Sequence, residues 1–224
     1  MNCKAVIFDL DDTLISEKVY IRSGYRAVSR FLESELPDIW EDIYARLLRL
    51  FDESSQNVFN RLLETYHVTY DQDDILELVR VYREHMPEIT FHEDVMETLL
   101  KLRENKVLLG ILSDGYTITQ RNKLKVLNAE SLFDKVILTD ELGREFWKPD
   151  PRPFQMFSKA FSLPFEEMMY VGDNPEKDFY IKKTFPIQTA RIYREDAVYQ
   201  KRCYRENIKE DISLHDLREL LQVE

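Results

Sequence analysis

Cysteine and histidine are scarce in this sequence, which argues against a disulfide-stabilised protein and against a zinc site built from these residues. The 224 residues contain only 2 cysteines, Cys3 and Cys203, so a disulfide framework is excluded and we expect free thiols in a reducing compartment. No metal-ligand spacing links the 4 histidines, which are His67, His85, His92 and His215. With only 5 glycines and 12% aromatic residues, the composition favours a compact, helix-rich protein over a disordered one.

The sequence also lacks a long apolar run and an excess of positive charge. No run approaches the ~18 apolar residues of a membrane-spanning helix, and the N-terminus has no basic segment before its short apolar stretch. The 42 acidic and 31 basic residues give a net charge of −11, which disfavours binding to nucleic acid or to an anionic membrane. We therefore expect a soluble, cytoplasmic protein, a monomer or weak homodimer, that binds neither nucleic acid nor membrane.

A helical segment follows directly after the first predicted strand. The short apolar run over 4–10, which includes the β-branched Val6 and Ile7, predicts a buried strand. Apolar residues then recur at helical spacing in four stretches, without an intervening strand, until Pro87. This pattern predicts an all-helical insert over residues 15–90.

Helices and strands alternate through the rest of the chain. We expect helices over 94–104, 117–127, 153–161 and 175–184, and strands over 107–112, 135–139, 168–171 and 189–193. Ser213, followed three residues later by Asp216, resembles the start of a last helix. Such alternation predicts a parallel sheet with helices on both faces. The expected fold class is α/β, with a Rossmann-like core over 1–14 and 91–224 around the helical insert.

Polar side chains follow four of the predicted strands. Because the carboxyl ends of parallel strands meet at one edge of a sheet, all four clusters are expected on the same rim. The clusters are Asp9-Leu10-Asp11-Asp12-Thr13, Ser113-Asp114-Gly115, Trp147-Lys148-Pro149-Asp150-Pro151 and Gly172-Asp173-Asn174-Pro175-Glu176-Lys177-Asp178. The rim is therefore the predicted site of chemistry.

These residue types indicate phosphoryl chemistry. Asp9 and Asp11 would point the same way on an extended segment, and their convergence with Asp173 requires a cation between the carboxylates. Mg²⁺ fits, since no histidine or cysteine that would favour zinc is nearby. One aspartate would then attack a phosphoryl group while its neighbour transfers a proton. Ser113 and Lys148 would supply a hydroxyl and a positive charge to the phosphoryl oxygens.

The stretches FDLDDTL, ILSDG, WKPDP and GDNPEKD, in this order and spacing, resemble the four motifs of the haloacid dehalogenase superfamily. The insert resembles the helical, C1-type cap domain that many members carry at this point, and ISLHDLRELL is similar to their last helix. The resemblance implies a phosphatase-type hydrolase in which Asp9 is the nucleophile, forming an aspartyl-phosphate. It implies that Asp11 is the general acid and then the general base. The catalytic residues would be Asp9, Asp11, Ser113 and Lys148.

The same resemblance implies the ligands of the metal and of the phosphate. Mg²⁺ would be held by a carboxylate oxygen of Asp9, the backbone carbonyl of Asp11 and the side chain of Asp173. Asp178 would orient Lys148 or reach the metal through water. Ser113 and Lys148 would hold the phosphoryl group of the substrate, and we expect Asp114, next to Ser113, as a further phosphate-binding residue.

We expect a Mg²⁺-dependent phosphohydrolase that cleaves a small-molecule phosphomonoester. Asp11 favours phosphate over carbon–halogen chemistry, because dehalogenating members lack an aspartate two residues after the nucleophile. A phosphomutase of the same family stays open as an alternative, as do a phospho-accepting receiver and a non-catalytic phospho-ligand-binding domain. The insert would select the substrate, with Arg22 and Arg26 on its first helix as candidate contacts for a second anionic group.

Overall fold

The computed structural model describes residues 3–198 and 201–222 of the chain. Contacts between Cα atoms divide the chain into two compact units. The first, or core unit, comprises Met1–Lys18 and Ile89–Glu224, and the second, or insert unit, comprises Val19–Glu88. Among the described helices, none combines the length and the apolar character that crossing a bilayer requires.

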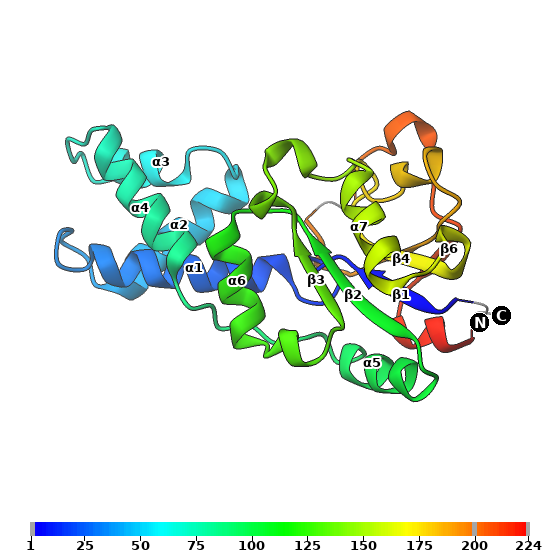
Figure 1. Ribbon diagram of the computed structural model, residues 1–224. Helices are drawn as coiled ribbons and strands as arrows, with labels where there is room; N and C mark the ends of the chain where they lie inside the picture. The colour runs from blue at the N-terminus through cyan, green and yellow to red at the C-terminus, as the bar shows by residue number, and fades with distance from the viewer. Residues whose placement is uncertain (1–2, 199–200, 223–224) are drawn as a thin grey trace. The chain divides into compact units, whose positions relative to one another are not determined.

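A parallel sheet forms the centre of the core unit (Figure 1). Its strands are β1 (Ala5–Phe8), β2 (Leu108–Ser113), β3 (Lys135–Leu138), β4 (Met168–Gly172), β5 (Gln188–Ile192) and β6 (Ile212–Leu214). They lie in the order β3-β2-β1-β4-β5-β6, and every neighbouring pair is parallel. The predicted α/β fold class is thereby confirmed. The strand order reverses between β1 and β4, which is where open parallel sheets bind their ligands.

Helices connect the strands and cover the sheet. The helices of the core unit are α5 (Val95–Glu104), α6 (Thr117–Val126) and α7 (Arg152–Phe161). Phe154 and Phe157 of α7 pack in a buried cluster with Ile7 of β1. Because side chains alternate along a strand, Phe8 points to the opposite face, where its ring meets that of Phe133 at 6.3 Å between centroids. Both faces of the central strand are therefore buried.

The insert unit is helical, as predicted. Its helices are α1 (Glu17–Leu32, of which the first two residues belong to the core unit), α2 (Trp40–Glu53), α3 (Val58–Thr65) and α4 (Gln72–Glu84). A capping box, in which Asp71 and Asp74 each accept a backbone N–H of the other, begins α4. On α1, a Cβ at Gly24 would lie 2.4 Å from the ring of Tyr82, so the close approach of α4 to α1 depends on this glycine.

The helix predicted over 175–184 is wrong. Only a 3-10 helix over Tyr180–Lys183 forms in this segment. The Asp178 carboxylate instead accepts the N–H of Asn174 at 2.8 Å and folds the chain into a tight loop after β4. This side-chain bond competes with helical hydrogen bonding, as aspartate often does near a turn.

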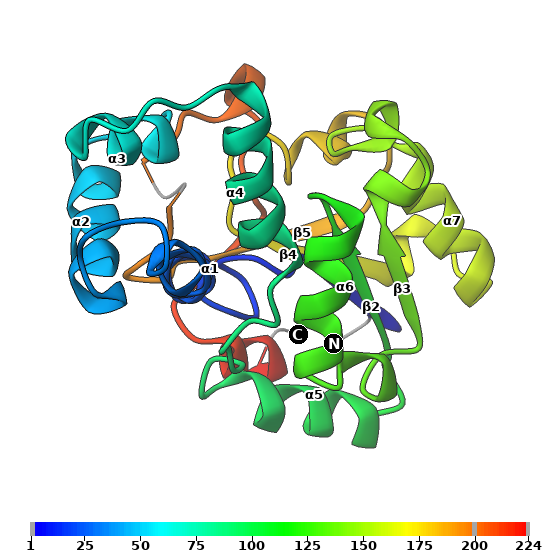
Figure 2. The same cartoon turned by 90° about the vertical axis from the view of Figure 1, so that its left-hand side faces the viewer.

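The predicted helix start at Ser213 is also wrong. Ser213 lies in the edge strand β6, and a 3-10 helix, η7 (Leu217–Gln222), follows it. The carboxylate of Glu219 accepts the backbone N–H groups of His215 and Asp216, which sets the start of η7 beyond the strand. In Figures 1 and 2, η7 lies beside α5.

Candidate active site

The loop after β1 gives its three aspartates different partners. Asp9 is buried, and its carboxylate lies 2.7 Å from the ammonium of Lys148. The Asp11 carboxylate instead turns to helix α6. Asp12 adopts a left-handed backbone conformation, with φ of 53°, and its carboxylate accepts the N–H of Glu17. Asp12 therefore shapes the loop, while the other two aspartates face charged partners.

The neighbouring strands β1 and β4 bring Asp9 and Asp173 to the same rim. The N–H of Asp9 donates to the carbonyl of Val171 at 2.8 Å, so the strand pairing continues up to the start of the acidic loop. A Cβ added to Gly172 would lie 2.5 Å from an oxygen of Asp178. The absence of a side chain at Gly172 thus lets a third carboxylate approach the rim.

Lys148 joins two of these carboxylates. Its buried ammonium lies 2.7 Å from Asp9 and 3.0 Å from Asp178, and it donates to the hydroxyl of Tyr170 at 2.7 Å. Burial opposes the charge on Lys148, but the carboxylates of Asp178 and Asp9 outweigh it and hold the pKa of Lys148 well above its usual range. Lys148 is therefore held in its charged form beside Asp9.

The carboxylates of Asp9, Asp173 and Asp178 form a buried cluster with the composition of a site for a hard cation. One oxygen from each lies within 4.8 Å of the others. Among the described residues, Oδ2 of Asp173 is buried without a hydrogen-bond partner. Burial, and then the charges of Asp178 and Asp9, raise the pKa of Asp173 well above its usual range. An ion such as Mg²⁺, which prefers carboxylate oxygens, fits this donor set and would relieve the repulsion.

We therefore expect added Mg²⁺ to stabilise the protein, by about 5 °C or more in the unfolding temperature at saturation. Because the pKa of Asp173 is raised on folding, the metal-free fold loses stability as pH rises from the ordinary aspartate pKa through the raised one. The gain from Mg²⁺ should consequently grow with pH over the same range. Thermal unfolding followed by circular dichroism, at several pH values with Mg²⁺ or with EDTA, measures both effects.

Asp173→Asn should stabilise the metal-free protein at neutral pH and abolish most of the shift with Mg²⁺, because it removes the unpartnered carboxylate. Asp52→Asn, at an exposed position of the insert, is the matched control and should keep the wild-type shift. A shift of the same size in Asp173→Asn and in wild type would show that the ion binds elsewhere.

Ser113 and Asp114 lie where the sequence predicts them, at the end of β2, and both side chains have partners. The hydroxyl of Ser113 accepts the side-chain amide of Gln120 at 2.6 Å. The Asp114 carboxylate accepts the hydroxyl of Thr139 at 2.8 Å and the N–H of Lys148 at 3.1 Å. It also pairs with the ammonium of Lys177 at 2.9 Å. These bonds hold the motif loops together, so the prediction that Asp114 binds phosphate can apply only to its backbone N–H.

The sequence reasoning missed three polar residues that contact the predicted site, which are Gln120, Lys123 and Tyr170. It placed Lys177 in the last polar cluster but gave it no role. Gln120 and Lys123 lie three residues apart on α6 and are buried on the same face as Leu124. Polar residues at the spacing of a buried helix face were the available signal. Tyr170 offered none, because a tyrosine in a buried strand is ordinarily part of the core.

The arginines proposed to select the substrate lie on α1 of the insert unit. Arg22 is exposed. Arg26 pairs with Glu88 and lies over the ring of Tyr44, at 5.6 Å from its centroid. Arg26 is therefore already engaged within the insert unit, and the contact role of both arginines stays a prediction.

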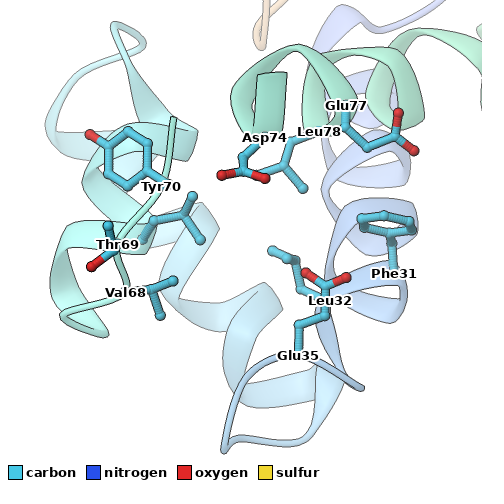
Figure 3. A pocket seen from close by; sticks show the side chains of 10 residues that line it. Phe31, Leu32, Glu35, Val68, Thr69, Tyr70, Asp74, Glu77 and Leu78 are labelled. Carbon is cyan, nitrogen blue, oxygen red and sulfur yellow. The ribbon is translucent and has the colours of Figure 1, made fainter. Parts of the chain in front are cut away.

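The insert unit also contains a cavity of about 260 Å³ (Figure 3). Its apolar wall includes Phe31 and Leu78, and carboxylates stand at its edge. Two of these carboxylates have partners, since Asp74 belongs to the capping box of α4 and Glu77 pairs with Arg80. The residues that line this cavity include no buried cation held between carboxylates, such as Lys148 between Asp9 and Asp178.

Comparison with known proteins places this arrangement in a family. Residues 6–192 match the family described as haloacid dehalogenase-like hydrolase. The chain is 30% identical over 194 residues to the glyceraldehyde 3-phosphate phosphatase of Pyrococcus abyssi, covering 84% of this chain and 80% of that one. It is 27% identical over 230 residues to the pyrophosphatase PpaX of Bacillus cereus, covering 100% of this chain and 97% of the relative.

The fold agrees with these relationships. The magnesium-bound structure of the HAD-hydrolase YfnB from Bacillus subtilis superimposes with a TM-score of 0.71 at 19% identity, covering 98% of this chain and 97% of that one. The family match includes the aspartate loop after β1, the loop after β2, Lys148 and the loop after β4. The chain belongs to the haloacid dehalogenase-like hydrolases, and it is a hydrolase of the phosphatase type.

Proposed function

We propose that this hydrolase is a Mg²⁺-dependent phosphohydrolase that cleaves a small-molecule phosphomonoester through an aspartyl-phosphate on Asp9. The observation that carries the proposal is that Asp9 contacts a buried cation, Lys148, and also belongs to the buried cluster of carboxylates with Asp173 and Asp178. Burial raises the pKa of Asp9 to about 6, against the opposing charge of Lys148. Asp9 is thus still mainly ionised at neutral pH and available as a nucleophile.

The cation would be held by the carboxylates of Asp9 and Asp173 and by the backbone carbonyl of Asp11. When bound, Mg²⁺ neutralises negative charge on the phosphoryl oxygens and on the carboxylates around them. Lys148 and the hydroxyl of Ser113 would bind the remaining phosphoryl oxygens. Asp178, 3.0 Å from Lys148, would orient that ammonium.

Two proton transfers by Asp11 accompany the two displacements. An oxygen of Asp9 attacks phosphorus, the bond from phosphorus to the ester oxygen breaks, and Asp11 gives a proton to the departing oxygen. Water then attacks the phosphorus of the aspartyl-phosphate, gives a proton to Asp11 and releases Asp9 with free phosphate. Atoms and protons balance if Asp11 is protonated when the first displacement begins, and it ends in that same protonated form. In the substrate-free structure burial raises the pKa of Asp11, but the charge of Lys123 outweighs burial and lowers the pKa below its usual range, so Asp11 must take up its proton when the substrate binds.

The substrate panel follows from the chemistry and from the relatives. The core motifs bind only a phosphoryl group and a cation, so the leaving group must be selected elsewhere, and we propose the insert as the substrate-selecting cap.

We further propose that the protein is a monomer or weak homodimer and that it is located in the cytoplasm. Glyceraldehyde 3-phosphate and pyrophosphate belong in the panel because relatives carry these substrates in their names.

The test is release of phosphate from this panel, extended to sugar phosphates, nucleotides and small phosphorylated acids, with Mg²⁺ or with excess EDTA. We expect turnover only with Mg²⁺, and a phosphorylated protein in acid-quenched samples that hydroxylamine cleaves. An isomerised substrate without free phosphate would indicate a phosphomutase. Stoichiometric phosphorylation without turnover would indicate a receiver, and binding without either would indicate a phospho-ligand-binding domain. Full turnover in EDTA would contradict the proposal.

A further inference from the structure

Lys123 is a buried cation that the proposed chemistry does not use. It lies on α6 with 1% of its surface exposed. Its ammonium is 2.5 Å from Oδ1 of Asp11 and 3.0 Å from Oε2 of Glu17. A lysine in such a position loses its hydration and needs charged partners to remain ionised. The Asp11 carboxylate supplies this charge. Glu17, whose pKa burial and the charge of Asp11 raise well above its usual range, contacts the ammonium as a second partner.

The second oxygen of Asp11 has a different partner on the same helix. Gln120 donates its side-chain amide to Oδ2 of Asp11 at 2.9 Å, and the same nitrogen lies 2.6 Å from the hydroxyl of Ser113. It also donates to the carbonyl of Asp114 at 3.0 Å. One amide therefore bridges the predicted proton-transfer residue and the predicted phosphate-binding loop.

The two oxygens of Asp11 are thus held with unequal strength. The bond from Lys123 comes from a charged ammonium at short distance, whereas the bond from Gln120 comes from a neutral amide that is shared among three acceptors. Charge-assisted hydrogen bonds are roughly twice as strong as those between neutral groups. A leaving-group oxygen that needs a proton from Asp11 can replace Gln120 more readily than Lys123.

We propose that Lys123 is a positioning residue that fixes Oδ1 of Asp11, leaving Oδ2 as the oxygen that transfers the proton. Gln120 holds the place of the leaving group at Oδ2 when no substrate is bound. Glu17, as second partner, keeps Lys123 in place while Asp11 changes partners. This inference rests on the proposed function, since it concerns the proton steps of the same site.

The test is a double-mutant cycle between Lys123 and Asp11, measured with two substrates. Lys123→Met should lower kcat for an alkyl phosphate at least about tenfold, because misplacing a catalytic group by a fraction of an ångström is costly. Phosphorylation by p-nitrophenyl phosphate, whose leaving group needs no proton, should fall by less than about threefold. In the Asp11→Asn background, Lys123→Met should have no further effect on either substrate.

Two further variants distinguish positioning from general support of the fold. Lys123→Arg keeps the charge and should recover most of the alkyl-phosphate activity. Lys125→Met, at an exposed position of the same helix, should match wild type. If Lys123→Met does not fold, the double variant Lys123→Met with Glu17→Gln carries the same test, because it removes a buried cation and a buried carboxylate together.

The inference is overturned if Lys123→Met lowers the rates with both substrates by the same factor. It is also overturned if Lys123→Met lowers the rate by the same factor in wild type and in the Asp11→Asn background. These outcomes are separate from a failure of the proposed function. Retained turnover in Asp9→Asn would contradict the proposed function itself. Loss of turnover in Asp9→Asn, together with a leaving-group effect in Asp11→Asn but none in Lys123→Met, would reject only the role of Lys123.

Discussion

Asp9→Asn is expected to lower turnover by about 10³-fold or more for every substrate, because it removes the nucleophile on which the covalent route depends. The amide is nearly the same size as the carboxylate, so the packing around it should change little. The buried position of Asp9 and the 2.7 Å contact with Lys148 place this effect at the chemical step. Steady-state phosphate release with saturating Mg²⁺ measures it.

The folded state provides the control for this variant. Burial raises the pKa of Asp9 to about 6, so ionised Asp9 costs the metal-free fold stability at pH values above that pKa. Asp9→Asn should therefore unfold at a temperature equal to or above that of the metal-free wild type at pH 8. Acid-quenched samples should contain no phosphorylated protein. A hydroxylamine-sensitive phosphoprotein in Asp9→Asn would mean that another residue is the nucleophile.

The position of the site could be predicted because it depends on strand ends. A short apolar run that contains β-branched residues, such as that of β1, is typical of a buried strand, and parallel strands bring the residues that follow them to one rim. Asp9 and Asp173 come together in this way although they lie far apart in the sequence. The periodicity of apolar residues and the positions of polar residues along the chain were sufficient to predict this part of the site.

The contacts of the site depend on tertiary packing that periodicity does not encode. Lys148 lies ten residues beyond the end of β3, and two short 3-10 helices carry it back to Asp9. Lys123 is an ordinary helix residue by sequence, and only the docking of α6 against the loop after β1 buries it. A lysine is most often solvated, so its burial could not be predicted from one sequence.

The segment after β4 shows how a local side-chain bond overrides propensity. The alternation of helices and strands along the sequence predicts a helix over residues 175–184. Asp178 instead closes a loop onto Asn174 and at the same time pairs with Lys148. The prediction that Asp178 orients Lys148 is compatible with this geometry, although the predicted helix beneath it is wrong.

Asp11→Asn is expected to lower hydrolysis of an alkyl phosphate by about 10²- to 10⁴-fold, the usual contribution of a positioned proton donor. Asparagine can keep a hydrogen bond with Lys123 through its carbonyl oxygen, but it cannot give a proton to the leaving group. The loss should be much smaller for the phosphorylation step with p-nitrophenyl phosphate, because that leaving group departs as a stable anion. Single-turnover kinetics with both substrates separates the two steps.

The role of Asp11 is tested by how the loss of activity in Asp11→Asn depends on the leaving group, and not by the size of that loss alone. In the structure its carboxylate contacts Lys123 and Gln120 and lies outside the cluster of Asp9, Asp173 and Asp178. Its replacement should therefore leave the stabilisation by Mg²⁺ close to that of wild type, which separates proton transfer from metal binding. An equal loss for both esters, with phosphorylation rate-limiting in each, would assign Asp11 to the placement of the loop instead of to proton transfer.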